Sequence, residues 1–290
     1  MAEHITKDRL IRDLKELGVK EGDSLNLKIS MKSIGYVEGG PNTVIEALRE
    51  VVGESGTLVA ESFVSSHHLS TLRKKTILSE PDSPSYAGAI ANAMIKYPGV
   101  YRSSHPIQRF TVLGARAKEL SENHTPDSYA YDILRVLAET GGKNLKIGAD
   151  GKVIGVGTTH VAIGLLGLKQ KIPREGIHYK DKDGNIRLFK RTWAGGCEKG
   201  FSNFVPLYEN ANAFIKVGKV GEAETTLSDM RKTLDLELDI MKKDPGFFLC
   251  DNPKCIDCRY SWPFSKGKGK RIMLPLLRSY IRLKRKLKKH

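Results

Sequence analysis

Segments typical of strands alternate with segments typical of helices along most of this 290-residue chain. A helix with a threonine cap and a final glycine is expected over residues 5–18, and an alternating strand follows at 24–29. A second helix over 41–52 is followed by a buried strand at 57–63. Alternation of this kind is typical of an α/β protein. We therefore expect a mixed central sheet covered by helices.

The rest of the chain extends this pattern less regularly. Residues 31–40 are expected to form a glycine-bearing loop, and residues 67–83, which have no clear period, a surface excursion. Further helices are expected at 85–97, 116–121, 131–139, 161–168, 211–217 and 223–242, and further strands at 110–113, 152–156 and 187–192.

The composition is that of a globular protein with a core. Hydrophobic residues make up 40% of the chain and charged residues 28%. No stretch approaches the roughly 20 apolar residues that a membrane-spanning helix needs. The start of the chain has charges of both signs and lacks the apolar region of a secretory signal. We therefore expect a cytoplasmic protein.

The net charge of +15 is concentrated at one end of the chain. Residues 265–290 hold eleven Lys or Arg and no Asp or Glu. The first 264 residues, with the other 37 basic and all 33 acidic residues, carry only +4. We therefore divide the chain into an α/β domain, residues 1–264, and a basic amphipathic tail, residues 265–290.

The tail has the pattern of a basic helix that lies on a surface. Apolar residues are spaced among its cations: Leu276, Leu277, Tyr280, Ile281 and Leu287. Such a helix favours an anionic membrane surface, by about 1 kcal/mol per cation, so we expect residues 266–290 to lie at the inner face of the membrane. A solvated tail or an RNA-binding end is the alternative. RNA binding would explain nothing in residues 15–160, so nucleic acid is not the partner we expect.

Three of the four cysteines lie close together in the sequence. Cys250, Cys255 and Cys258 are separated by four and by two residues, and Cys197 lies between paired glycines and a glutamate. A Cys-x-x-Cys turn brings two sulfurs close enough to bind one tetrahedral ion. We expect the four thiolates to bind a structural Zn²⁺. Four protein ligands complete its tetrahedral coordination, so the ion has no open position for catalysis. An iron–sulfur cluster, or free cysteines in a loop, are the alternatives.

Several segments, in order, resemble the aminoglycoside 3-N-acetyltransferase (antibiotic acetyltransferase) family. The most distinctive are Val52-Gly-Glu-Ser-Gly-Thr-Leu-Val59, Pro98-Gly-Val-Tyr-Arg-Ser-Ser-His-Pro106 and Ile154-Gly-Val-Gly157. The others cover residues 17–25, 30–40, 43–48 and 83–90. A branch of this family also resembles the chain in having a Gly-Gly-Cys and a C-terminal cysteine triplet. The resemblance implies the fold of this family and acetyl transfer from acetyl-CoA to an amine of an amino sugar.

This chemistry requires three kinds of group. A base must take a proton from the amine, and hydrogen-bond donors must stabilise the oxyanion that forms. The CoA phosphates need helix N-termini, hydroxyls or cations. By the resemblance, the candidates for CoA binding lie in two of the matching segments: Ser30, Lys32, Ser33, Arg102 and Ser103. The alternative for each is a turn residue that shapes the fold.

The chain departs from the family where the resemblance places the catalytic residues. The family has a catalytic histidine ten residues after the first glycine of Gly-Val-Gly, and a glutamate three residues later, and these positions hold Leu165 and Leu168. A His-Ser-Ser segment of the family is replaced by Lys28-Ile-Ser. The remaining candidates for catalytic groups are His160, at the start of the same expected helix, His105 and Glu198.

The expected function is therefore acyl-CoA-dependent N-acetylation of an amino sugar or related glycan precursor, in the biosynthesis of a cell-surface polysaccharide. One alternative is a catalytically inactive member of this fold that binds a glycan or a partner at the membrane surface. Another is a zinc-stabilised nucleic-acid binder.

Overall fold

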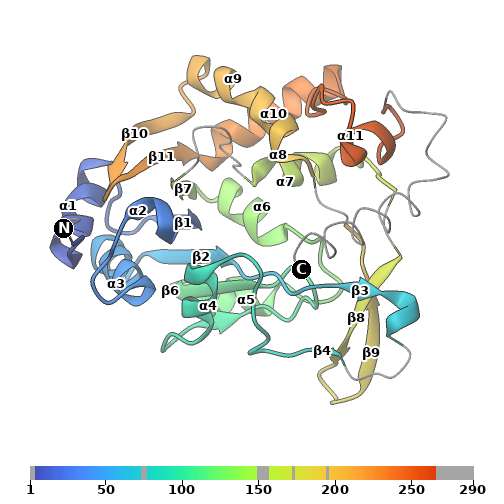
Figure 1. Ribbon diagram of the computed structural model, residues 1–290, viewed down its shortest axis with the longest axis horizontal. Helices are drawn as coiled ribbons and strands as arrows, with labels where there is room; N and C mark the ends of the chain where they lie inside the picture. The colour runs from blue at the N-terminus through green and yellow to red at the C-terminus, as the bar shows by residue number, and fades with distance from the viewer. Residues whose placement is uncertain (1–3, 73–76, 149–156, 172–173, 194–195, 266–290) are drawn as a thin grey trace, which may run out of the picture.

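The computed structural model describes residues 4–72, 77–148, 157–171, 174–193 and 196–265. Its centre is a seven-stranded mixed sheet (Figure 1). In the order of the sheet, its strands are β10 (Phe214–Val220), β11 (Ala223–Asp229), β7 (Lys143–Ile147), β1 (Ser24–Ile29), β2 (Thr57–Glu61), β6 (Phe110–Gly114) and β5 (Tyr101–Arg102). β7, β1 and β2 are parallel, and the strands on either side of them are antiparallel. The expected mixed central sheet is confirmed.

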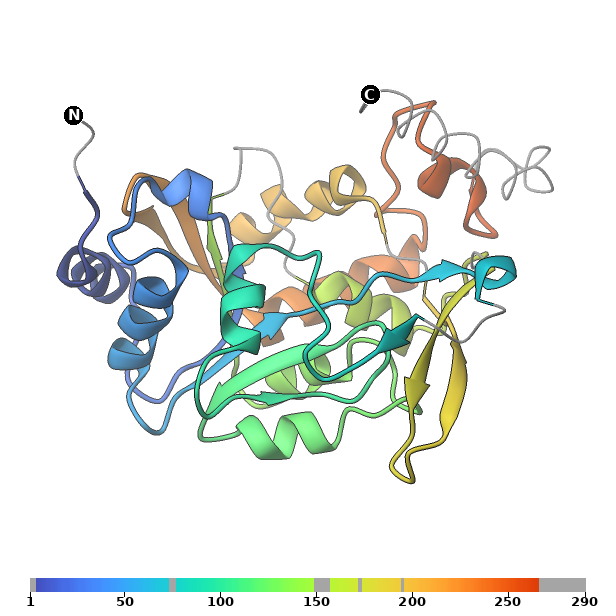
Figure 2. The ribbon, with the colours of Figure 1, turned by 60° about the horizontal axis from the view of Figure 1, so that its bottom comes forward.

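Helices cover both faces of the sheet because its central strands are apolar on both sides (Figures 1 and 2). On β2, Leu58 and Ala60 pack into the core beneath α1 (Lys7–Glu16), α3 (Pro41–Val52) and α4 (Ala89–Ile95). Val59, between them in sequence, faces the opposite core. The opposite core lies beneath α5 (Ala117–Glu122), α6 (Asp132–Glu139), α7 (Thr158–Leu165) and α10 (Met230–Lys243). These helices complete a three-layer arrangement.

A smaller sheet lies beside the large one. It contains β3 (His67–His68), β8 (Glu175–Lys180) and β4 (Leu78–Ser79), with β9 (Ile186–Lys190) paired to β8. A small core of its own, which includes Val64 and Phe189, joins it to the domain. The remaining helices are short: α2 (Met31–Ile34), α8 (Glu198–Phe201), α9 (Val205–Asn210) and α11 (Ile256–Tyr260). None of the helices in the described part of the chain is both long enough and apolar enough to span a bilayer.

The expected helix over residues 211–217 is wrong, and so are the first seven residues of the one expected over 223–242. Residues 214–217 belong to β10 and residues 223–229 to β11, which form a hairpin, and only α10 is helical. On β11, Ala223, Thr225 and Leu227 are buried with exposed or partly exposed residues between them, which is the period of a strand. β7 and β8 were not expected, and the strand expected at 152–156 lies outside the described residues.

The boundary between β11 and α10 depends on one side chain. The Asp229 carboxylate accepts hydrogen bonds from the backbone N–H groups of Arg231 and Lys232, and so caps α10. Asp229→Ala is expected to lower the free energy of unfolding by about 1 kcal/mol, as measured by urea denaturation. Asp239→Ala, on the exposed side of the same helix, is the matched control and should change the free energy by less than about 0.5 kcal/mol. Equal losses in the two variants would contradict the assigned cap.

Candidate active site

A cleft of about 550 Å³ opens at the carboxyl ends of the three parallel strands. Its floor is formed by Lys28 near the end of β1 with Ser30 just after it, Glu61 at the end of β2, and Lys146 near the end of β7 with Gly148 just after it. In open α/β sheets, ligands bind at this edge where neighbouring strands run to opposite sides of the first one. Here β2 and β7 lie on opposite sides of β1, so the cleft has the expected position of a ligand site.

Charged side chains of both signs meet at the floor of the cleft. The Nζ of Lys28 lies 3.4 Å from Oε1 of Glu61, and only 15% of the Glu61 side chain is exposed. Lys146 is the register partner of Lys28 on the neighbouring strand and also lines the cleft. Glu61 was not among the expected site residues. It could have been identified in the sequence as a carboxylate at the end of a strand that was expected to be buried.

His160 lines the cleft from the first turn of α7. Its ring stacks on Tyr131, with centroids 4.3 Å apart, and contacts the edges of Trp193 and Phe201 at 5.6 and 5.0 Å. Burial in this apolar cage, and next the charge of Lys28, lower the pKa of His160 to about 3. The imidazole is therefore neutral at physiological pH, with a lone pair free to accept a proton. Its buried Nδ1 has no hydrogen-bond partner among the described residues.

Ser30 caps the N-terminus of α2, the short helix that follows β1 and contains Lys32 and Ser33. The Ser30 hydroxyl accepts the backbone N–H of Ser33, and the two hydroxyl oxygens are 2.8 Å apart. Gly148 has φ 74°, and a Cβ there would lie 2.4 Å from the Cβ of Ser33, so only glycine lets the end of β7 approach this turn. Ser30 lines the cleft, Ser33 lies directly behind it, and Lys32 is exposed.

The structure places Arg102 and Ser103 outside the cleft. The Arg102 guanidinium donates to the carbonyl oxygens of Ser62, Pro81 and Ser83 at 2.6–2.8 Å, so it joins a loop to the end of β2. Burial lowers its pKa to about 10. The fully buried Ser103 accepts the backbone N–H of Phe110. The polar groups of both residues thus bind other parts of the protein.

His105 is also outside the cleft. It is fully buried, and its ring stacks on His124 with centroids 5.1 Å apart. Its Nδ1 accepts the backbone N–H groups of Ile107 and Gln108, which fixes the turn before β6. Burial lowers its pKa to about 3. Of the two histidines expected as candidates, only His160 faces the cleft.

The four cysteines come together in space. The sulfurs of Cys197, Cys250, Cys255 and Cys258 all lie within 4.8 Å of one another, and those of Cys197 and Cys255 are 3.7 Å apart. A backbone N–H, that of Cys250, donates to the sulfur of Cys258 at 3.3 Å. Hydrogen bonds from neighbouring thiols, that of Cys258 first, lower the pKa of Cys197 to about 5. We call this cluster the four-thiol centre.

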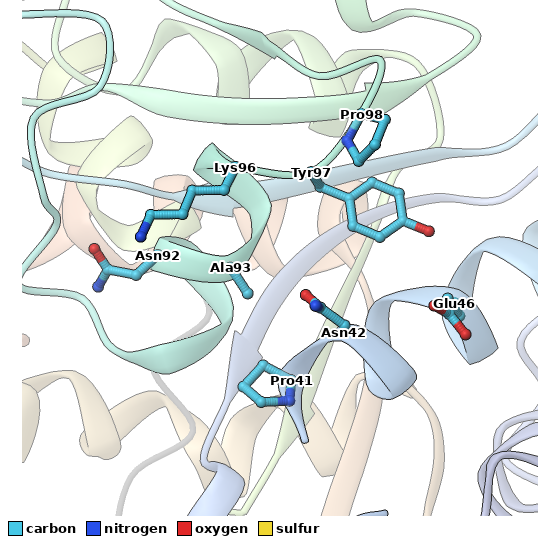
Figure 3. Close-up of a pocket in the computed structure, with 8 residues that line it drawn as sticks. All are labelled: Pro41, Asn42, Glu46, Asn92, Ala93, Lys96, Tyr97 and Pro98. Carbon is cyan, nitrogen blue, oxygen red and sulfur yellow. The ribbon is translucent and has the colours of Figure 1, made fainter. Parts of the chain in front are cut away.

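A second hollow, of about 670 Å³, lies between α3 and α4 on the outside of the domain (Figure 3). Figure 3 shows Asn42 and Glu46 on one side of it, and Asn92 and Lys96 on the other. None of the residues expected to act in catalysis or CoA binding lines this hollow. The cleft at the strand ends is therefore the candidate active site.

Comparison with known proteins gives the family of the chain. The family model described as aminoglycoside 3-N-acetyltransferase matches residues 27–242. The chain belongs to this family. The aminoglycoside N(3)-acetyltransferase VII of Streptomyces paromomycinus is 36% identical over 163 residues, which cover 50% of this chain and 56% of the relative. A type III enzyme of a Salmonella species is 34% identical over 132 residues, which cover 41% and 46%. The chain thus spans about half the length of the curated relatives it matches.

Solved structures share the fold of this chain. The chain superimposes on AAC-IIIb, solved as a binary complex with CoASH, with a TM-score of 0.71 and 25% identity. That match covers 83% of this chain and 97% of the other. The YokD protein of Bacillus subtilis gives a TM-score of 0.73 and 26% identity, over 84% and 96%. The resemblance inferred from sequence motifs is confirmed.

Leu165 stands where the family resemblance places a catalytic histidine, so its position relative to the cleft matters. It is the last residue of α7, is 53% exposed and does not line the cleft. Five residues turn an α-helix by about 140° beyond a full turn, so His160 and Leu165 face different directions. Leu168, beyond the helix, packs against the core instead. The position that the resemblance gives for the family's histidine is therefore occupied by a leucine outside the cleft, and the histidine of this helix that faces the cleft is His160.

Glu198 enters the cleft from the opposite wall. It is the first residue of α8, directly after Cys197, and it lines the cleft together with Gly196 and Phe201. Its side chain is exposed to solvent. The cleft therefore brings together His160 and two carboxylates, one half-buried in the floor and one exposed in the wall.

Proposed function

We propose that the chain transfers an acetyl group from acetyl-CoA to an amine of an amino sugar or related glycan precursor. The observation that carries this proposal is His160, a neutral imidazole in a cleft that also holds Glu61 and Glu198. The fold supports it, because a related structure with the same fold is a binary complex with CoASH.

In the proposed reaction, His160 accepts the proton that the amine must lose. The amine nitrogen attacks the thioester carbonyl carbon, the C–N bond forms, and the oxyanion collapses as the C–S bond breaks. The nitrogen becomes much more acidic as it bonds to the carbonyl carbon, so even a weakly basic imidazole can take its proton at that step. The acceptor attacks as the neutral amine, after its ammonium form has released one proton to solvent. The CoA thiolate leaves and takes the proton from the His160 imidazolium, so the base is restored. Glu61 stabilises that imidazolium between the two proton transfers.

Ser30 and Ser33 are proposed to bind acetyl-CoA at the β1 edge of the cleft, where their hydroxyls lie side by side. We propose that Lys32, which is exposed two residues after Ser30, binds its phosphates. Arg102 and Ser103 are not part of this proposal, because their polar groups bind the protein itself.

The charge of the cleft supports a glycan precursor as the acceptor. Four of the described residues that line it are charged at neutral pH, Lys28 and Lys146 against Glu61 and Glu198, which gives no net charge. An aminoglycoside carries several ammonium groups, and a cleft without negative charge gives it no electrostatic attraction. A sugar with one amine, alone or next to a phosphate or carboxylate, fits the balanced charges better. This argument favours polysaccharide biosynthesis over drug modification.

We expect kcat/KM for a glucosamine-type acceptor to exceed that for sisomicin by at least about tenfold, measured by the release of the CoA thiol. Lys146→Glu changes the charge of the cleft by −2 and should raise the turnover of sisomicin relative to the same acceptor. A preference of the unmodified protein for sisomicin would contradict the charge argument. The absence of any turnover, together with no CoA binding at millimolar concentration in calorimetry, would contradict the transferase itself.

The four-thiol centre is proposed to bind a structural Zn²⁺. Zn–S bonds of about 2.3 Å in a tetrahedron separate the sulfurs by about 3.8 Å, close to the 3.7 Å between Cys197 and Cys255. Sulfurs that all lie within 4.8 Å of one another fit a single ion better than an iron–sulfur cluster, whose several irons hold their cysteines farther apart. Metal analysis of freshly purified protein tests this directly.

Two other functions are alternatives to acetyl transfer. If CoA does not bind, the cleft is best interpreted as a glycan or partner site in an inactive relative. Steep loss of RNA binding with salt would favour a zinc-stabilised nucleic-acid binder instead.

We also propose that the protein is cytoplasmic and that residues 266–290, which lie outside the described residues, attach it to an anionic membrane surface. Liposome sedimentation that is unaffected by deleting these residues would contradict this attachment.

A further inference from the structure

The four-thiol centre adjoins the cleft through Cys197. The residues on either side of Cys197, Gly196 and Glu198, both line the cleft. Cys197 is also the N-cap of α8, and its carbonyl oxygen accepts the backbone N–H groups of Gly200 and Phe201 at 2.9 and 3.0 Å. Any ligand that fixes the Cys197 sulfur therefore fixes the start of the wall that carries Glu198.

The other three cysteines lie in a segment that packs tightly against the same wall. A Cβ at Gly200 would lie 2.0 Å from the carbonyl oxygen of Phe248 and 3.0 Å from the backbone nitrogen of Cys250. The backbone of this segment is therefore in direct contact with α8. The ring of Phe201 lies between the two parts, with its centroid 6.1 Å from Phe248 and 5.0 Å from His160.

A second line of aromatic contacts joins the same segment to His160. Trp262, four residues after Cys258, contacts Phe248 at 4.9 Å and Trp193 at 6.3 Å between ring centroids. Trp193 in turn contacts His160 at 5.6 Å. These two tryptophans are the only ones in the chain. Trp262 belongs to the segment that holds three of the four cysteines, and Trp193 contacts a histidine of the cleft.

The segment that holds three of the cysteines is anchored by side chains rather than by regular secondary structure. Phe248 and Trp262 are buried in the main core, and the Asn203 amide donates hydrogen bonds to the carbonyl oxygens of Phe247 and Leu249. Between the end of α10 at Lys243 and the start of α11 at Ile256 there is no helix or strand. An irregular segment of this kind keeps its conformation through cross-links and side-chain packing rather than through a backbone ladder. The four sulfurs are such a cross-link when a metal joins them.

We infer that the four-thiol centre is a working part of the cleft, in which a bound metal positions Glu198 and the aromatic cage of His160. The metal fixes Cys197 relative to the irregular segment, and the contacts of Gly200, Phe201 and Trp262 transmit that position to the cleft wall. Metal removal then changes the cleft itself, and does not only lower the stability of the domain. Glu198 acts here as a positioned side chain, whatever its part in the reaction.

The two tryptophans allow this inference to be tested apart from activity. Trp262→Phe leaves Trp193 as the reporter of the cleft, and Trp193→Phe leaves Trp262 as the reporter of the centre. Zinc is removed from each full-length variant with a chelator and then restored, with far-UV circular dichroism as the check that the domain stays folded. We expect the emission maximum of both reporters to shift on removal and to return with zinc. We also expect KM for the acceptor to rise several-fold in the metal-free protein that contains both tryptophans.

Each outcome decides a different claim. Loss of zinc that shifts Trp262 emission but leaves Trp193 emission and KM unchanged would overturn the coupling. Absence of zinc from the purified protein, with no uptake of added zinc, would overturn the metal and the coupling together. If Trp193 emission responds to zinc but no acceptor is acetylated, the coupling stands and the transferase proposal, on which only the KM readout rests, fails.

Discussion

Replacing His160 by phenylalanine is expected to lower kcat for acetyl transfer by about 10²–10⁴-fold, the range that a general base contributes. Phenylalanine keeps a flat ring against Tyr131, Trp193 and Phe201, so the cage around position 160 stays filled. It removes both nitrogens, and with them the proposed proton acceptor. Because the pKa of His160 is held at about 3, the same mechanism predicts no loss of activity from its protonation between pH 5 and pH 8.

Two comparisons separate a catalytic from a structural role of His160. His160→Ala opens a cavity and should lose both activity and stability, whereas the phenylalanine variant should lose activity with CoA binding retained in calorimetry. His105→Ala removes a buried turn residue outside the cleft, so it should lower stability without a comparable loss of kcat in the folded protein. A phenylalanine variant with kcat within a few-fold of the unmodified protein would show that the proton acceptor lies elsewhere.

The elements predicted well from sequence are those whose packing and local period agree. α1, α3, β1 and β2 each have one apolar face or an apolar run, and each ends at a glycine, a cap or a turn. The hairpin of β10 and β11 was missed because it has apolar residues only at intervals among lysines and threonines. Its strand character comes from pairing with β7, a contact between residues about 80 positions apart that no local period contains.

Some residues of the candidate active site could be identified from the sequence, and others required the three-dimensional structure. The four cysteines could be grouped from spacing alone, since sulfur chemistry identifies them wherever the fold places them. His160 could be named as a candidate but not placed, because the count across the preceding loop pointed to Leu165. Glu61 needed the register of β1 and β2, which brings it beside Lys28. Arg102, Ser103 and His105 share a segment that resembles the family, and the structure shows that this segment shapes the fold around β6.

A buried carboxyl group behind α7 is expected to make the stability of the domain depend on pH. Glu237 on α10 is fully buried, and its Oε1 accepts the hydroxyl groups of Thr159 and Tyr208. Its Oε2 has no hydrogen-bond partner among the described residues. Burial raises the pKa of Glu237 to about 7, although the hydrogen bonds from Thr159 and Tyr208 act in the opposite direction. The folded protein therefore holds this proton more tightly than the unfolded chain, whose glutamate has a pKa near 4.5.

The sign of the effect on stability follows from this difference in proton binding. Between pH 4.5 and pH 7 the folded state binds more protons at Glu237 than the unfolded state does, so the stability that this group contributes falls as the pH rises. The buried histidines His105, His124 and His160 have lowered pKa values and act in the opposite direction below pH 6.5. The pH dependence of the unmodified protein alone cannot isolate Glu237, but a variant that keeps the three histidines can.

Glu237→Gln is that variant, because glutamine keeps an oxygen that can accept the hydroxyl groups of Thr159 and Tyr208 but does not titrate. From pH 5 to pH 8 the unmodified protein is expected to lose about 2–3 kcal/mol of unfolding free energy relative to Glu237→Gln. Urea denaturation at several pH values measures this difference. Glu224→Gln, on an exposed position of β11, is the matched control and should follow the unmodified protein at every pH. Parallel curves for Glu237→Gln and the unmodified protein would mean that Glu237 is ionised in the folded state. The network behind α7 would then hold a charge rather than a proton, stabilised by the hydroxyl groups of Thr159 and Tyr208.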